Sequence, residues 1–240
     1  MPFSHMVRAL QRGLGQVTEE SQSSGVIWRD DDVPVSSRFD DPYFSLDNGL
    51  AETRHVFLDG NDLPARLAPG FRVAELGVGT GLNLLALAHC AAAAGVDGVS
   101  YTGFEAFPLA RDDLARALAP FPELAAPAKD LLAAWHPDGF DARIGPVTAR
   151  MIVGDARVTL AAWDGRADAW FLDGFSPAKN PELWEAHLMS EVGSHTAPGG
   201  SFATYSAAGH VRRALSEAGF VVERRPGFGR KRHMSAGRRS

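Results

Sequence analysis

The sequence has a single cysteine, Cys90, among its 240 residues. One thiol excludes a disulfide within the chain and a zinc site built from several cysteines. Cys90 lies in an alanine-rich run, which is typical of a small buried apolar side chain. Because such sparse cysteine use fits a reducing compartment, we expect a cytoplasmic protein.

The sequence also lacks an apolar run that is long enough to cross a membrane. Its most apolar segment, LNLLALAHCAAAAG, has 14 residues, whereas a transmembrane helix needs roughly 20. The N-terminal stretch MPFSHMVRALQRGLG contains no apolar core of a signal peptide. We therefore expect no membrane partner.

Basic residues are not in excess, because 24 Lys and Arg stand against 29 Asp and Glu and give a net charge of −5. This balance gives no global signature of a nucleic-acid-binding protein and leaves that role to a local basic patch. The histidines are scattered without metal-ligand spacing, so no metal site is expected. The sequence has neither a Walker A lysine motif nor a G-x-S-x-G nucleophile elbow.

What the sequence does contain is a regular alternation of strand-like and helix-like segments from about Phe71 onward. This alternation predicts an α/β fold with a doubly wound, mostly parallel sheet. We predict a leader over 1–25, an N-terminal extension over 26–70 and the main domain over 71–240. In the extension, ETRHVFL and LPARL flank DGND at 59–62, which predicts a β-hairpin.

Two segments of the main domain carry more specific expectations. Residues 119–150 have poor periodicity and predict only a short helix around ELAAPAKDLLAAW and a loop. NPELWEAHLMSEVGSHT predicts a helix with Asn180 as its N-cap and Pro181 at its first position. The last segment, from Phe220 onward, predicts a pair of strands.

A glycine-rich turn, ELGVGTG, follows the first strand of the main domain. Glycine at 77, 79 and 81 allows a tight turn and a close approach of the backbone to a ligand. The dinucleotide pattern G-x-G-x-x-G needs glycine at position 82, which is Leu82, so an NAD site is disfavoured. With the acidic Glu75 before it, the turn is similar to the S-adenosylmethionine loop of class I methyltransferases, whose ligand is cationic. The alternative is a tight turn that binds nothing.

Carboxylates follow two further strands. Glu105 ends the second strand and is placed to accept both hydroxyl protons of a ribose. Asp155 follows the third strand and is either a partner for an adenine amino group or a helix N-cap. Because ligands bind at the carboxyl ends of strands in an open α/β sheet, we expect these groups to share one site.

The segment FLDGFSPAKNPELW, at 171–184, ends the fourth strand with an acid, an aromatic and a proline. Asp173 can hold an amine through its N–H, orient its lone pair and take its proton. Phe175 offers a stacking face for a base, and Pro177 stiffens the loop. The alternative is a strand-end turn residue beside a core phenylalanine.

Longer strings carry a closer resemblance. FLDGFSPAKNPELW, PGGSFATYSAAGHVRRALSEAGF and RPGFGRKRHM, together with FDDPYFSLDNGLAETRHVFLDGNDLPARL upstream, resemble the methyltransferase domain of the MnmC family of bifunctional tRNA wobble-uridine modification proteins. The resemblance covers about Trp28 to Gly237 and is weak across 119–150. It implies transfer of a methyl group from S-adenosylmethionine to the aminomethyl nitrogen on C5 of the wobble (2-thio)uridine in tRNA.

The resemblance also implies residue roles. Asp173 would position the amine and Phe175 would sandwich the base, while Glu105 would hold the ribose and Asp155 the adenine. Further cofactor or acceptor contacts are implied for Glu75, Gly77, Gly79, Gly81 and Asn83, which would hold the methionine part, and for Asp47, Asn48 and Glu52. Because no oxidase fingerprint is seen in this chain, the amine is expected to come from elsewhere, with a separate FAD-dependent oxidase as an implied partner.

Basic residues crowd the C-terminal region despite the acidic total. The resemblance favours tRNA contact for some of this set, whereas the composition alone favours a solvated basic face, or one that pairs with acids of the same chain. The candidate RNA-binding residues are Lys179, Arg212, Arg224, Arg225, Arg230, Lys231 and Arg232.

Two other functions remain open on the same fold. One is a small-molecule amine alkyl transferase of the aminopropyltransferase type, which would use an acidic acceptor pocket. The other is an RNA-binding or scaffold protein that keeps the fold and binds no cofactor.

Overall fold

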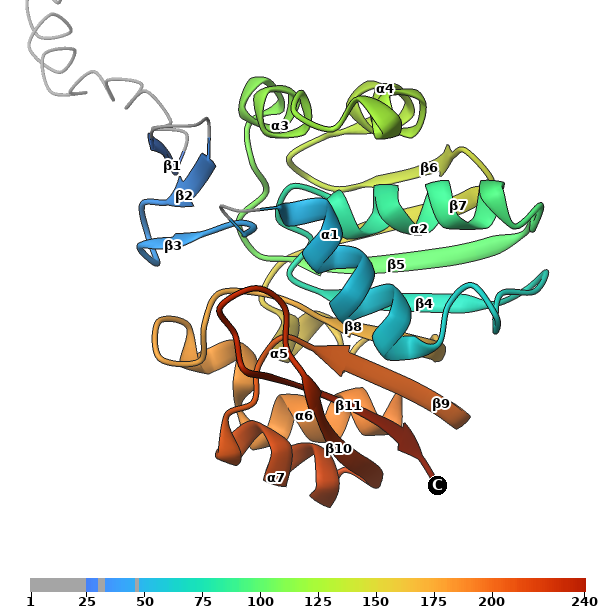
Figure 1. The fold of residues 1–240 in the computed structure, drawn as a ribbon, viewed down its shortest axis with the longest axis vertical. Coiled ribbons are helices and arrows are strands. Elements are labelled where there is room, and N and C mark those ends of the chain that lie inside the picture. The colour runs from blue at the N-terminus through green and yellow to red at the C-terminus, as the bar shows by residue number, and fades with distance from the viewer. Residues whose placement is uncertain (1–24, 30–32, 46–47) are drawn as a thin grey trace, which may run out of the picture.

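A mixed, mostly parallel sheet of eight strands runs through the protein (Figure 1). The computed structural model describes residues 25–29, 33–45 and 48–240. Five neighbouring strands are parallel, and an antiparallel strand pairs at each side of them. In spatial order the strands are β10 (Phe220–Pro226), β11 (His233–Arg239), β9 (Thr196–Thr204), β8 (Ala167–Leu172), β4 (Arg72–Leu76), β5 (Val99–Glu105), β7 (Val147–Val153) and β6 (Phe140–Ile144). The predicted doubly wound α/β sheet is confirmed.

Helices cover both faces of this sheet. One apolar core lies under α2 (Leu82–Ala93) and α4 (Ala125–Ala134), with α3 (Arg111–Leu118) beside it. The other lies under α5 (Ala156–Thr159), α6 (Ala186–Ser194) and α7 (Gly209–Glu217). In β8, Trp170 and Leu172 belong to the second core and Phe171 to the first, as the period of two in a strand requires.

The N-terminal extension has two parts. A three-stranded antiparallel sheet, β1 (Val26–Arg29), β2 (Val33–Ser36) and β3 (Asp41–Pro42), lies beside the main sheet (Figure 1). It is followed by α1 (Gly49–Thr53), which continues as a π-helical turn over Arg54–Leu58 and a 3₁₀ turn over Asp59–Asn61. The hairpin predicted around DGND is therefore wrong. The predicted leader, apart from Gly25, lies outside the described residues.

Burial explains why this segment is helical. The Asn48 side chain caps α1 by accepting a hydrogen bond from the backbone N–H of Ala51 at 2.9 Å. The apolar residues Leu50, Val56 and Phe57 then enter the core beneath α2, where tertiary packing outweighs a turn preference.

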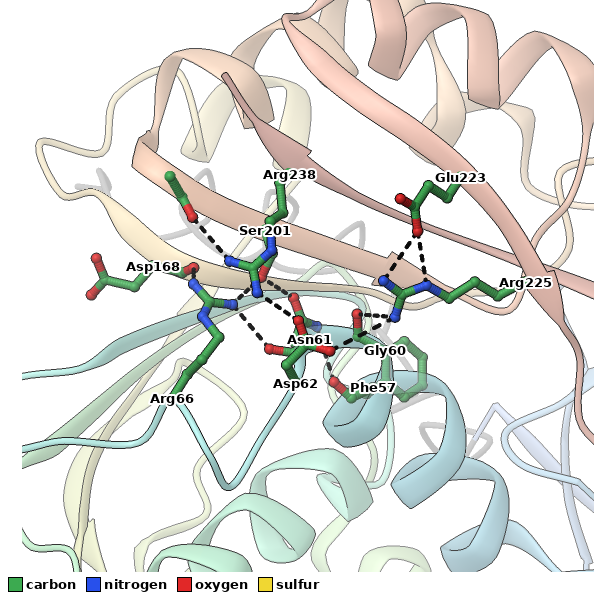
Figure 2. A network of polar contacts seen from close by, with 11 residues as sticks. Phe57, Gly60, Asn61, Asp62, Arg66, Asp168, Ser201, Glu223, Arg225 and Arg238 are labelled. Atoms are coloured by element: carbon green, nitrogen blue, oxygen red, sulfur yellow. Dashed lines mark hydrogen bonds and ion pairs between the residues drawn. The ribbon is translucent and has the colours of Figure 1, made fainter.

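A buried polar network fastens the end of this helical segment to the main sheet (Figure 2). The Asn61 side chain is fully buried and donates to the carbonyl oxygens of Phe57 at 2.9 Å and Trp170 at 3.2 Å. It also accepts from Ser201 Oγ at 2.5 Å. Arg66 donates to the carbonyl oxygens of Asn61 and Asp168, both at 2.9 Å. Because these groups belong to the extension, β8 and β9, the extension is an integral part of the domain.

Two other expectations differ from the structure. Strand β6 was missed, and it pairs with β7 through a turn at Gly145, whose φ is +56°. The helix predicted over 180–196 is divided in the structure, because 181–184 form a 3₁₀ turn and α6 begins only at Ala186. Pro181 is the first residue of that turn, and Asn180 precedes it without a side-chain cap. That turn buries Trp184, whose Nε1 donates to the Phe175 carbonyl oxygen at 2.9 Å. The short helix around α4 and the terminal strand pair are confirmed.

Candidate active site

Three strand ends meet in the middle of the sheet. The backbone N–H of Gly77 donates to the Phe104 carbonyl oxygen at 2.9 Å, and that of Asp173 donates to the Leu76 carbonyl oxygen at 3.1 Å. Chain order places β5 and β7 on one side of β4, and β8 and β9 on the other. The chain therefore changes the direction in which it adds strands at β4, which makes this place a topological switch point. Ligands bind at switch points of this kind in open α/β sheets. A cavity of about 600 Å³ opens here, which is a size typical of small-molecule sites.

The glycine turn forms one wall of this cavity. Gly77, Gly79 and Gly81 all have positive φ values, of 79°, 53° and 69°. A Cβ atom on Gly77 would lie 2.8 Å from the Asp173 carbonyl oxygen, and one on Gly79 would lie 3.2 Å from the Tyr43 ring. The tight turn predicted from the sequence is therefore confirmed, and side chains at Gly77 and Gly79 would collide with other parts of the protein. Gly81 is not among the residues that line the cavity.

Glu105 supports this turn from the end of β5. Its two carboxylate oxygens accept from the backbone N–H groups of Gly79 and Phe107, both at 2.8 Å. Burial raises the pKa of Glu105, and these two hydrogen bonds oppose that rise. Glu105 also lines the cavity, and a contact of its carboxylate with a ribose stays a prediction.

Asp155 also lines the cavity, but it is the N-cap of α5. It accepts from the Arg157 backbone N–H at 2.9 Å, and an ion pair to the Arg157 guanidinium at 2.6 Å accompanies that bond. Arg157 lowers the pKa of Asp155. The N-cap interpretation is thus observed, and a contact with adenine stays a prediction.

Asn83, at the start of α2, joins the acidic groups of the site. Its Nδ2 donates to Glu75 Oε1 at 2.6 Å and to Asp173 Oδ2 at 2.8 Å. Its Oδ1 accepts from Thr53 Oγ1 at 2.9 Å, which fixes the orientation of the amide. Asn83 is therefore the residue that holds the Asp173 carboxylate in place.

Glu75 lies behind the cavity wall rather than in it. The side chain is fully buried, and its second oxygen accepts from the Tyr101 hydroxyl. Burial raises the pKa of Glu75 well above its ordinary value, and the charge of Asp173 adds to the rise. The structure therefore connects Glu75 to the cavity through Asn83, and a direct contact with a cofactor stays a prediction.

Asp173 lines the cavity directly after β8. Its Oδ1 accepts from the Gly174 backbone N–H at 2.8 Å. Burial is the main cause that raises the pKa of Asp173 from 3.8 to about 6. The hydrogen bonds from Gly174 and Asn83 oppose this rise. The negative charge of Glu52 adds to the rise, and the positive charge of Lys231 opposes it. The carboxylate is thus ionised at neutral pH and more basic than an exposed aspartate.

Aromatic rings form the wall beside Asp173. Phe175 stacks on Phe39, with ring centroids 4.8 Å apart, and meets the edge of Tyr43 at 5.1 Å. Asp41 of the small sheet accepts from the Ser176 backbone N–H at 2.8 Å, which ties that sheet to the loop. Sequence reasoning missed Phe39 and Tyr43, because nothing in their local pattern shows that they meet a loop over 130 residues away.

The predicted basic residues are not all in one patch. Lys179 lies 3.6 Å from Asp40 and 3.5 Å from Asp41, and Arg225 lies 3.2 Å from Glu223. Arg230 lines the cavity, while Arg224 and Arg232 are exposed. Arg212, on α7, is partly buried.

The predicted DNGLAET segment is likewise divided. Glu52 lines the cavity and pairs with Lys231, whose Nζ lies 2.7 Å from Glu52 Oε1. Asn48 caps α1 and is not among the cavity-lining residues. Asp47 lies outside the described residues.

Comparison with known proteins identifies the family. A family model described as S-adenosyl-L-methionine-dependent methyltransferase matches residues 122–240. The tRNA 5-methylaminomethyl-2-thiouridine biosynthesis bifunctional protein MnmC of Caulobacter sp. (strain K31) is 48% identical over 229 residues. The chain belongs to the S-adenosyl-L-methionine-dependent methyltransferases. The predicted cofactor and the predicted likeness to the MnmC family are confirmed.

Two further relatives define the extent of the match for this methyltransferase. The bifunctional protein MnmC of Chromohalobacter salexigens is 46% identical, and the alignment covers 88% of this chain and 32% of that protein. The crystal structure of MNMC2 from Aquifex aeolicus superposes with a TM-score of 0.70 at 25% identity, over 88% of this chain and 69% of that one. The Caulobacter alignment covers 88% of this chain and 37% of its relative. This methyltransferase thus has the class I fold and spans about a third of the length of the curated relatives it matches.

The described part of this methyltransferase holds neither a metal cluster nor a membrane-spanning helix. Within it, no three His, Cys, Asp or Glu side chains are grouped so that they can hold a metal ion. No helix of residues 25–29, 33–45 and 48–240 combines the length and apolarity of a membrane span.

Proposed function

We propose that this methyltransferase transfers a methyl group from S-adenosylmethionine to the primary amine of a 5-aminomethyl group on the wobble uridine of tRNA. The product is the 5-methylaminomethyl nucleoside, with 2-thiouridine among the bases accepted. The names of the curated relatives support the substrate. The observation that carries the chemistry is the Asp173 carboxylate, which Asn83 and Gly174 fix beside the glycine turn in one cavity.

The cavity offers exposed backbone to the cofactor, because one of its walls is the glycine turn, where Gly77 and Gly79 leave no room for a Cβ atom. Gly77 and Gly79 would lie under the methionine part, and Glu105, which lines the cavity, would accept from the ribose hydroxyls. When bound, S-adenosylmethionine supplies a methyl group on a cationic sulfur that leaves as a neutral thioether.

The residues of this chain then act on the acceptor. Asp173 accepts a hydrogen bond from the amine N–H, which aims the nitrogen lone pair at the methyl carbon. The nitrogen lone pair would form the new N–C bond, and the electron pair of the C–S bond would stay with the departing thioether. The proton that leaves nitrogen passes to Asp173, whose pKa of about 6 allows it to release that proton to solvent at neutral pH.

The tRNA is proposed to approach from the open side of the cavity, where the loop between β10 and β11 ends. Arg230 lines the cavity there, and Arg224 and Arg232 are exposed nearby in the sequence. Contacts of this kind with phosphates weaken steeply with salt. A cytoplasmic location and a separate FAD-dependent oxidase that exposes the amine are part of the same proposal.

The direct test is transfer of a labelled methyl group into tRNA that carries the 5-aminomethyl group. We expect labelled 5-methylaminomethyluridine in the nuclease digest, and no label with tRNA that has an unmodified wobble uridine. A polyamine serves as the competing acceptor. Faster transfer to the polyamine than to the tRNA would replace the proposal with an alkyl transferase that acts on small amines.

A further inference from the structure

A carboxylate on α1, Glu52, is nearly buried at the edge of the candidate active site. The Glu52 side chain is 11% exposed and lies in the cavity wall. A carboxylate removed from water requires a cationic or hydrogen-bonding partner. Its partner is the Lys231 ammonium at 2.7 Å, which comes from 179 residues further along the chain.

The two members of this pair differ in how firmly they are held. Glu52 is part of a helix whose neighbours enter the core, whereas the Lys231 side chain is 46% exposed. Lys231 lies in the loop between β10 and β11, and its flexible stem brings the ammonium in from the solvent side. The carboxylate is therefore fixed, and the ammonium is the member that can leave.

Lys231 also occupies an aromatic site. Its Nζ lies 4.0 Å from the centroid of the Tyr205 ring, a cation–π distance. The Tyr205 hydroxyl donates to the Gly174 carbonyl oxygen at 2.6 Å, directly after Asp173. A carboxylate and an aromatic face thus hold a primary ammonium beside the loop that carries the proton acceptor.

The second carboxylate of the site is within electrostatic reach. Glu52 raises the pKa of Asp173 and Lys231 lowers it, so the three charges act on each other. A cation that enters between Glu52 and Asp173 is attracted to both carboxylates. The place now taken by the Lys231 ammonium therefore has the chemistry of a primary-amine site.

We propose that Glu52 and Tyr205 form the recognition site for the ammonium group of the acceptor, and that Lys231 occupies this site until the acceptor displaces it. The bound ammonium gives one proton to Asp173 before methyl transfer, which leaves its nitrogen with the lone pair that the transfer needs. The inference rests on the proposed function, because it assigns the amine end of that substrate. The exchange keeps the buried Glu52 carboxylate paired throughout, which avoids the large cost of an unpaired buried charge. The released Lys231 remains at the mouth of the cavity, where a polyanionic carrier offers it phosphates.

The test is a binding measurement that does not depend on methyl transfer. Calorimetry of the full chain with S-adenosylhomocysteine present compares two nucleosides, 5-aminomethyluridine and its neutral analogue 5-hydroxymethyluridine. We expect Glu52→Gln to weaken binding of the aminomethyl nucleoside by about tenfold or more, as expected for a charge-assisted hydrogen bond. We expect Lys231→Gln to tighten it several-fold, because the competing internal cation is gone.

Matched controls separate recognition from folding. Binding of the hydroxymethyl nucleoside should change less than twofold in both variants, and Lys129→Gln, at an exposed lysine on α4, should alter neither affinity. The double variant Glu52→Gln/Lys231→Gln should bind the aminomethyl nucleoside no more tightly than Glu52→Gln alone. This double variant also removes the unpaired buried charge, so it remains informative if Lys231→Gln folds poorly.

Three results would overturn the inference: weaker or unchanged binding of the aminomethyl nucleoside to Lys231→Gln, equal effects of Glu52→Gln on both nucleosides, or no binding of either nucleoside to the wild type. The proposed function is judged separately, by methyl transfer from the wild type into aminomethyl tRNA. If the wild type methylates aminomethyl tRNA but one of these three binding results is found, only the proposed role of Glu52 and Lys231 is removed.

Discussion

Replacing Asp173 with asparagine should make the protein more stable at neutral pH while it removes the activity. In the folded protein the pKa of the Asp173 carboxyl group rises from 3.8 to about 6, chiefly because the group is buried. This difference corresponds to about 3 kcal/mol by which ionised Asp173 destabilises the fold above pH 6. Asparagine has a similar shape and no charge, so it escapes this penalty.

Hydrogen bonds reduce the gain. Asp173 accepts from both the Gly174 backbone N–H and the Asn83 amide, and an asparagine oxygen can keep only one of these bonds well. The lost bond costs about 1 kcal/mol. The net gain of about 2 kcal/mol should raise the Tm by about 4–8 °C in a chain of this size.

The pH dependence gives the sharper check. Because the folded pKa is raised, the folded wild type binds a proton more tightly than the unfolded chain between pH 3.8 and about 6. As pH rises through this window, ionisation of Asp173 therefore lowers the free energy of unfolding of the wild type. The Asp173→Asn variant has no such loss, because asparagine does not titrate. Thermal unfolding at pH 4.5 and pH 7.5 should show an advantage of the variant at the higher pH that is small or absent at the lower one.

Activity should move in the opposite direction. Without the proton acceptor, kcat for tRNA methylation should drop by about 100-fold or more, with cofactor affinity within twofold of the wild type. Asp164→Asn, at an exposed aspartate, is the matched control and should change the free energy of unfolding by less than about 0.5 kcal/mol. A variant at Asp173 that is less stable at pH 7.5, or whose advantage does not depend on pH, would refute this account of the site.

Three further substitutions test other parts of the structure. Gly77→Ala should weaken S-adenosylmethionine binding, measured by calorimetry, by about tenfold or more, because the added Cβ would lie 2.8 Å from the Asp173 carbonyl oxygen. The control is Gly70→Ala, at a glycine with φ +85° and nothing within 4 Å of the added Cβ. It should keep the wild-type affinity and lower the free energy of unfolding by about 1 kcal/mol. Glu105→Gln leaves one acceptor oxygen for two backbone N–H groups and should weaken cofactor binding by about tenfold, and unchanged binding would remove the ribose role. Asn61→Leu leaves the polar groups of the buried network in Figure 2 without hydrogen-bond partners. It should lower the free energy of unfolding, measured by urea titration, by about 3 kcal/mol. A loss below about 1 kcal/mol would contradict this network.

The parts of the site that the sequence could predict are those with a local signature. The strand, glycine turn and helix around Gly77 form a contiguous pattern, and Asp173 follows a clear apolar strand. Because parallel strands end at the same edge, strand ends alone were enough to bring Glu105 and Asp173 together.

The parts that failed depend on tertiary contacts. The segment ETRHVFL alternates well enough for a strand, but Phe57 and its neighbours pack as a helix beneath α2. Strand β6 has only five residues and gains its pairing from β7. Thr53 on Asn83, Phe39 on Phe175 and Glu52 on Lys231 come from 30 to 179 residues away and leave no mark in local sequence.

The order of strands at the C-terminal edge has a consequence for how the protein is made on the ribosome. Strand β11 lies between β9 and β10, although β10 is synthesised first. In the part of the chain that the structure describes, β10 pairs with no other strand, so it must wait for β11 before it can join the sheet. The turn between them carries Lys231 and Phe228 to the cavity. During translation, the carboxyl ends of β4, β5, β7 and β8 can therefore come together before this turn reaches the cavity wall.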